Sequence, residues 1–143
     1  MNVKKIIGFA FLSIFVCVTL IAVFSIFYTT IGGLFVLFNV EYDSLWSLGY
    51  FVGLLFIIGL FTELLFGGLI TFAMAYARTK LEGMTIEFGL NFVENLIVLM
   101  LVNIIVQSVV VPPGVILIMA VLLAIGSCVL ESKYKLVENN GDM

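Results

Sequence analysis

The chain has 143 residues, of which 64% are hydrophobic and 10% are charged, and its formal net charge is −3. A soluble domain is about half apolar and about a quarter charged. With a mean hydropathy of +1.33, this composition excludes a soluble globular fold and predicts a polytopic membrane protein. The sequence contains no histidine, which excludes histidine metal sites and Ser-His-Asp triads.

The first expected transmembrane helix covers residues 6–30. Residues 6–38 carry no charge. This stretch is longer than the ~20 residues that cross a bilayer but too short for two crossings. We therefore expect one long or tilted helix that ends near Gly32. A cleaved signal peptide is the alternative, because Lys4 and Lys5 precede the run. The run, however, exceeds the ~7–15 residues of a signal-peptide core.

Three more apolar runs follow along the chain. An acidic turn, residues 39–44, precedes the second run, and Pro112 with Pro113 marks a tight reversal before the last. A polar stretch between the second and third runs forms an expected cytoplasmic loop, residues 78–89. The expected spans after the first are residues 47–77, 90–111 and 115–131.

The basic residues fall in three short patches at the ends of these spans: Lys4, Lys5, Arg78, Lys80, Lys133 and Lys135. Four crossings place all of them on one side of the membrane, whereas Glu41 and Asp43 fall on the other. By the positive-inside rule, both termini are cytoplasmic. We therefore expect an all-α protein of the cell membrane, with four transmembrane helices in a single membrane domain, residues 1–143.

One carboxylate, Glu63, lies near the centre of the second expected span. A central charge costs about 2.5–3.5 kcal/mol on insertion scales, so Glu63 should face protein or water rather than lipid. Two interpretations stay open. The carboxyl is either protonated and donates a hydrogen bond across a helix interface, or it faces a water-filled cavity and titrates.

Amide side chains on the third expected span are candidate partners for Glu63. They recur at multiples of four residues and form a polar stripe: Asn91, Asn95, Asn103 and Gln107. Such amides face other helices, because unsatisfied polar groups are costly in lipid. Glu94 is expected near the cytoplasmic end, too shallow to pair with Glu63. Asn103 is the better match in depth.

The sequence shows no constellation of residues for catalysis. Cys17 and Cys128 lie at different depths of their apolar runs, which argues against a disulfide, and nothing nearby completes a metal site. In the 78–89 loop, Glu82 and Glu87 have no motif around them. We therefore expect a non-enzymatic protein without metal or cofactor.

The stretch VEYDSLWSLGYFVGLLFIIGLFTELLFGGL, residues 40–69, resembles the YrvL family of bacterial membrane regulatory proteins. The Tyr42-x-Ser44 turn and Glu63 are its most diagnostic features, and the chain length and four-span layout are also similar. The resemblance implies a negative regulator that restrains an alternative sigma factor in a Gram-positive bacterium. No catalytic residue comes with it.

Three functional hypotheses follow. The first is a non-enzymatic regulator that binds a cytoplasmic transcription regulator through its helices or through loop candidates on the cytoplasmic side: Arg78, Lys80, Glu82 and Glu87. The second is a small proton-coupled transporter that acts as a dimer and uses Glu63, although the four-span transporters of this kind carry their glutamate in the first helix. The third is an accessory subunit of a larger membrane complex. Besides the lipid bilayer, the expected partners are proteins, including a second copy of the chain, and not nucleic acid.

Overall fold

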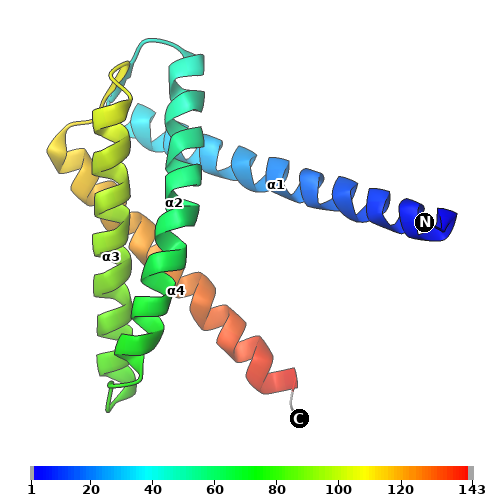
Figure 1. Cartoon of the computed structure of the whole chain (residues 1–143). Helices are drawn as coiled ribbons and strands as arrows, with labels where there is room; N and C mark the ends of the chain where they lie inside the picture. The colour runs from blue at the N-terminus through cyan, green and yellow to red at the C-terminus, as the bar shows by residue number, and fades with distance from the viewer. Residues whose placement is uncertain (1, 142–143) are drawn as a thin grey trace. The chain divides into compact units, whose positions relative to one another are not determined.

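The computed structural model describes the backbone of residues 2–141 and the side chains of residues 2–132, and it forms two compact units, Met1–Asn39 and Val40–Met143. The chain is 85% helical, which confirms the all-α prediction. The elements are α1 (Val3–Leu37), β1 (Glu41–Tyr42), α2 (Leu45–Met74), α3 (Lys80–Ile105), β2 (Val109–Val110) and α4 (Pro113–Gly141) (Figure 1). Over the described residues, four of these helices are long and apolar enough to cross a membrane.

The first unit is the single long helix α1. Its serine and threonine side chains each donate to the carbonyl oxygen four residues earlier, as Ser13 does to Phe9 at 2.9 Å and Thr29 does to Ser25 at 2.8 Å. These bonds satisfy the serine and threonine donors within the helix, which suits an apolar solvent. The helix does not end near Gly32 as expected, because one glycine costs only about 1 kcal/mol in a helix. It ends at Leu37, shortly before Asn39 takes a positive φ of 52°.

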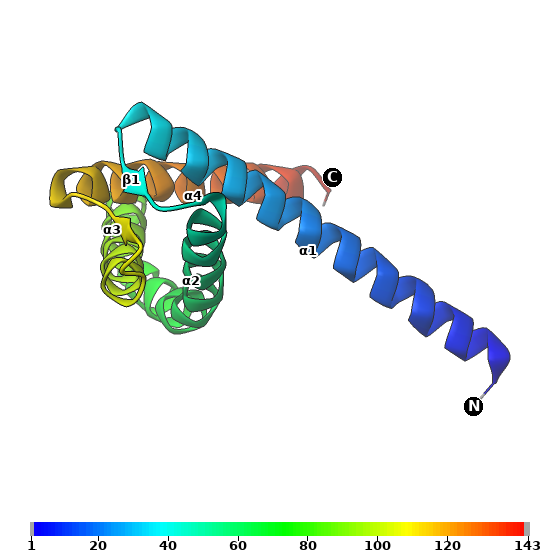
Figure 2. The same ribbon diagram turned by 90° about the horizontal axis from the view of Figure 1, so that it is seen from above.

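The second unit is built around α3, which packs against α2 and against α4. Helices α2 and α3 run side by side in opposite directions, and α4 crosses α3 obliquely (Figures 1 and 2). The side chains between the helices are large and apolar, and Phe51, Val52, Val102 and Met119 are completely buried. The core of this unit therefore lies on both sides of α3.

Two side-chain caps define where α2 and α3 begin. The Ser44 hydroxyl accepts a hydrogen bond from the backbone N–H of Ser47 at 3.2 Å, and the Thr79 hydroxyl accepts from that of Glu82 at 3.1 Å. Glu82 in turn accepts from the N–H of Arg78 at 2.9 Å. Thr-x-x-Glu is the pattern of a capping box. The cap starts α3 at Lys80, so residues 80–89 are helical. The expectation of a loop over residues 78–89 is therefore wrong for most of its length.

A short two-stranded pairing lies at the opposite end of the unit. We call this pairing, residues 41–42 with residues 109–111, the clasp. Strands β1 and β2 pair antiparallel, with Glu41 opposite Val110 and Tyr42 opposite Val109. The Asn103 side chain binds the backbone of Val111 twice, accepting from its N–H at 3.0 Å and donating to its carbonyl at 3.4 Å. The expected helix over residues 90–111 therefore ends at Ile105. The following valines, which favour extended backbone, belong to the clasp.

Candidate functional site

Two carboxyl groups meet on the facing helices α2 and α3. The Glu94 carboxyl lies within hydrogen-bonding reach of the Thr62 side chain and close enough to Glu63 for the two charges to interact. Glu94 is only 9% exposed, whereas Glu63 is exposed on α2. The expectation that Glu94 lies too shallow to face Glu63 is therefore wrong.

The error in depth follows from the misplaced start of α3. From the ends of the two helices at their connecting turn, Glu63 lies 11 residues back along α2 and Glu94 lies 14 residues forward along α3. At 1.5 Å per residue, these counts correspond to about 17 Å and about 21 Å. The Thr79-x-x-Glu82 signal was in the sequence. With it, the two acids could have been placed at similar depth.

The amides of α3 do not form one polar interface with α2. Asn91 donates to the Cys128 sulfur of α4 at 3.9 Å, and Asn95 donates to the carbonyl oxygen of Asn91 on its own helix at 2.8 Å. Asn103 belongs to the clasp with Val111, and Gln107 is exposed beyond the end of α3. Asn103, the candidate that best matched Glu63 in depth, therefore pairs with the Val111 backbone instead.

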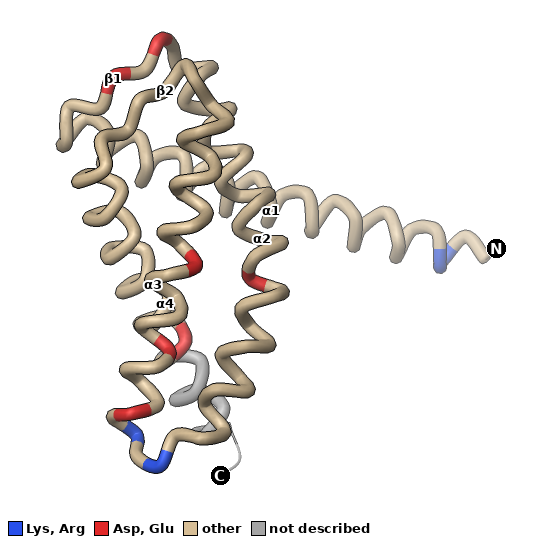
Figure 3. The backbone as a smooth tube through the Cα atoms, turned by 60° about the vertical axis from the view of Figure 1, so that its left-hand side comes forward, with Lys and Arg blue, Asp and Glu red and all other residues tan. Residues whose placement is uncertain are grey.

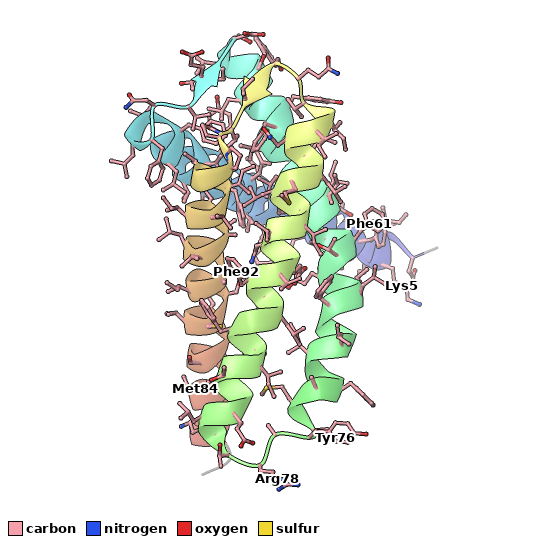
Figure 4. The ribbon with its side chains drawn as sticks, turned by 90° about the vertical axis from the view of Figure 1, so that its left-hand side faces the viewer. Lys5, Phe61, Tyr76, Arg78, Met84 and Phe92 are labelled. Carbon is pink, nitrogen blue, oxygen red and sulfur yellow. The ribbon has the colours of Figure 1, made fainter. Side chains whose placement is uncertain are left out.

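The α2–α3 turn exposes the remaining candidates for docking. Arg78, Lys80 and Glu82 are exposed, and Figure 4 shows Arg78 at the tip of the turn with Tyr76 beside it. A shallow hollow of about 300 Å³ lies against the turn, lined by Tyr76, Ala77, Leu81, Glu82, Thr85 and Ile86. Glu87 differs from the other three, because it is buried in α3 with 6% of its surface exposed. Its carboxylate is therefore not presented to a docking partner.

A second hollow, of about 490 Å³, lies against the clasp. It is lined by Val40, Glu41, Tyr42, Asp43, Gln107, Ser108 and Val110. Within the part of the chain that the structure describes, no group of three or more His, Cys, Asp or Glu side chains could hold a metal ion. The hollow therefore offers polar surface and negative charge but not a metal cage.

The comparison with protein families decides the relationship. The family described as "Regulatory protein YrvL" matches residues 8–133, which is most of the chain and includes α2, α3 and both hollows. The chain belongs to the YrvL family of regulatory proteins. Searches of curated proteins and of solved structures gave no match.

Two of the residues that carry the sequence resemblance to the family have structural roles in this YrvL-family chain. Tyr42 lies in β1 of the clasp, and Ser44 is the N-cap of α2, so the Tyr42-x-Ser44 turn sets where the second helix begins. Glu63 has no such local role. Its carboxyl lies close enough to that of Glu94, on the next helix, for the two charges to interact.

Contact between Thr62 and Glu94 predicts that the two side chains contribute jointly to stability. In a double-mutant cycle of Thr62→Val and Glu94→Leu, we expect a coupling of about 0.5–1.5 kcal/mol in the free energy of unfolding, the range found for polar contacts between membrane helices. Thr71→Val is the matched control, because both hydroxyls donate to a carbonyl of their own helix, Thr62 to Gly59 and Thr71 to Gly67, whereas only Thr62 is within reach of Glu94. Paired with Glu94→Leu, it should be additive within about 0.5 kcal/mol. Equal coupling in both cycles would contradict the contact.

Proposed function

We propose that this YrvL-family protein lies in the cell membrane with four transmembrane helices and both termini in the cytoplasm. There it acts as a non-enzymatic negative regulator of an alternative sigma factor, through protein–protein contact. Family membership supports the regulatory part of this proposal. The length and apolar composition of the four helices support the membrane part.

The distribution of charge is the observation that carries the orientation. In the second unit, Arg78 and Lys80 lie at the α2–α3 turn, and Glu41 and Asp43 lie at the clasp, at the opposite end of α2 and α3 (Figure 3). Lys and Arg accumulate on the cytoplasmic side of membrane proteins. The turn is then cytoplasmic and the clasp is outside.

The α2–α3 turn is the surface we assign to the sigma factor or to a protein that controls it. Two cations stand beside exposed apolar side chains, since Tyr76 is 72% exposed and Leu81 is 75% exposed. A partner that presents an acidic surface with an apolar side chain suits this combination, because charge steers the encounter and apolar burial retains the complex.

Thiol labelling tests the orientation. In a variant without Cys17 and Cys128, a single cysteine is placed at Leu81 in the turn or at Val110 in the clasp; both positions are exposed. A membrane-impermeant maleimide applied to intact cells is expected to label the Val110→Cys protein only, and to label the Leu81→Cys protein after the membrane is permeabilised. Labelling of Leu81→Cys in intact cells would contradict the proposed orientation.

Removal of the protein tests the regulatory role. Deleting the gene is expected to raise a small set of transcripts that depend on one alternative sigma factor, because the restraint on that factor is lost. A plasmid copy of the gene should lower them again.

A further inference from the structure

One face of α2 combines small residues with a carboxyl group. Gly59, Glu63, Gly67 and Thr71 follow one another at four-residue spacing, so they lie along one side of the helix. A Cβ atom added at Gly59 or Gly67 would meet no atom of another helix within 4 Å, and Glu63 and Thr71 are exposed. This surface, the Glu63 face, is open to close approach by another helix, as small residues at this spacing allow.

Among the described side chains of the second unit, none supplies a neutralising charge for Glu63. Over these side chains, residues 40–132, no hydrogen bond or ion pair reaches its carboxylate, and the Glu94 carboxyl lies close enough for the two charges to interact. Arg78 and Lys80 lie beyond the end of α2, at least about 17 Å away along the helix axis. Ionisable groups within membrane spans almost always pair with one another or face a polar cavity. Within the described part of the second unit, the Glu63 face therefore has no cationic complement.

We propose that the Glu63 face binds a transmembrane helix of another membrane protein that carries a lysine or arginine near the middle of its span. A cation there would pair with Glu63 and would also gain from the nearby Glu94 carboxyl. The open glycines allow the partner backbone close enough for a direct ion pair. This inference rests on the membrane location in the proposed function.

A second copy of the chain fits this face less well than a cationic helix does. Two-fold symmetry would bring the same surfaces together, so each Glu63 would meet another Glu63, with Glu94 close behind it. Like charges in a low-dielectric environment repel strongly. A second copy of the chain would therefore place more carboxyl groups beside Glu63, where a cation is needed.

A pair of host peptides tests the proposal on the full-length protein. The protein is reconstituted in vesicles of phosphatidylcholine and phosphatidylglycerol. Energy transfer then measures its association with a leucine-rich transmembrane peptide that has one central lysine, or with the same peptide with leucine at that position. We expect the lysine peptide to bind about tenfold tighter. The preference should vanish in Glu63→Gln and persist in the control Glu41→Gln, which removes an exposed acid at the clasp.

Three results would overturn the proposal: equal binding of the two peptides, a lysine preference that survives Glu63→Gln, or energy transfer between two copies of the protein that the lysine peptide does not reduce. In cells, a photoreactive amino acid at Leu60, beside the face, should crosslink to a protein with a basic residue inside a membrane span. Crosslinks to lipid or to a second copy alone would also overturn it.

The outcome separates this inference from the proposed function. Absence of the lysine preference, together with raised transcripts in the deletion strain, would reject the Glu63 partner and leave the negative regulator intact. A clear lysine preference with unchanged transcripts would reject the regulator and retain the partner.

Discussion

Reversing both charges of the α2–α3 turn, Arg78→Glu with Lys80→Glu, is expected to raise transcription of the regulated genes nearly to the level of a deletion strain. Both side chains are exposed at the tip of the turn, so their replacement leaves the helix core unchanged. The double reversal turns a positive patch into a negative one. An acidic partner surface would then be repelled, which costs several kcal/mol at a docked interface. A reporter fused to one regulated promoter measures the effect.

The controls for this experiment separate docking from folding and from orientation. Arg78→Lys with Lys80→Arg keeps both charges and should keep full repression. The reversed variant retains four basic residues, Lys4, Lys5, Lys133 and Lys135, which continue to favour the same orientation. Its amount in the membrane and the labelling of a cysteine at Leu81 confirm that orientation. Full repression by a correctly inserted reversed variant would show that the partner does not dock at this turn.

Asn103→Leu is expected to lower the free energy of unfolding by about 1–3 kcal/mol, because it leaves the backbone N–H of Val111 without its partner. Val111 is 2% exposed, so water cannot easily replace the lost bonds. Domains of this size have a total stability of about 5–15 kcal/mol, so this loss is large. Unfolding of the purified protein in detergent, followed by circular dichroism, measures it.

Asn95→Leu is the matched control for Asn103→Leu. Both asparagines are half-buried on α3, but Asn95 donates only to a carbonyl of its own helix. Its replacement leaves no backbone group outside α3 without a partner. We therefore expect the free energy of unfolding to change by less than about 0.5 kcal/mol. If the two variants unfold alike, the clasp does not stabilise the end of α3.

Much of the helical fold follows from the sequence, whereas the helix ends do not. Long apolar runs predicted the helices, because length and hydropathy are strong signals. Hydropathy says nothing about where a helix begins. The Thr79 cap makes α3 begin among polar residues, earlier than the apolar run does. At the other end, the last apolar residues of the run belong to the clasp and not to the helix. Local hydrogen bonds decided both boundaries.

The polar site was harder to predict than the fold. Glu63 stands out because it is one carboxylate in a long apolar run, and the family resemblance that included it is confirmed. Its neighbour could not be read from hydropathy, because pairing across two helices depends on register. Register depended on the cap at Thr79. The interaction of Asn103 with Val111 involves a backbone group, and no side-chain pattern in the sequence indicates such a bond.

A genome-wide RNA profile of a deletion strain, its parent and a plasmid-complemented strain is the measurement that tests the central claim most directly. The proposed function predicts that a small set of genes rises together in the deletion strain, that the plasmid restores them, and that their promoters share one alternative sigma factor. The same plasmid carrying Arg78→Glu with Lys80→Glu should fail to restore them. No coordinated change, in growth and under stress, would contradict the negative regulator.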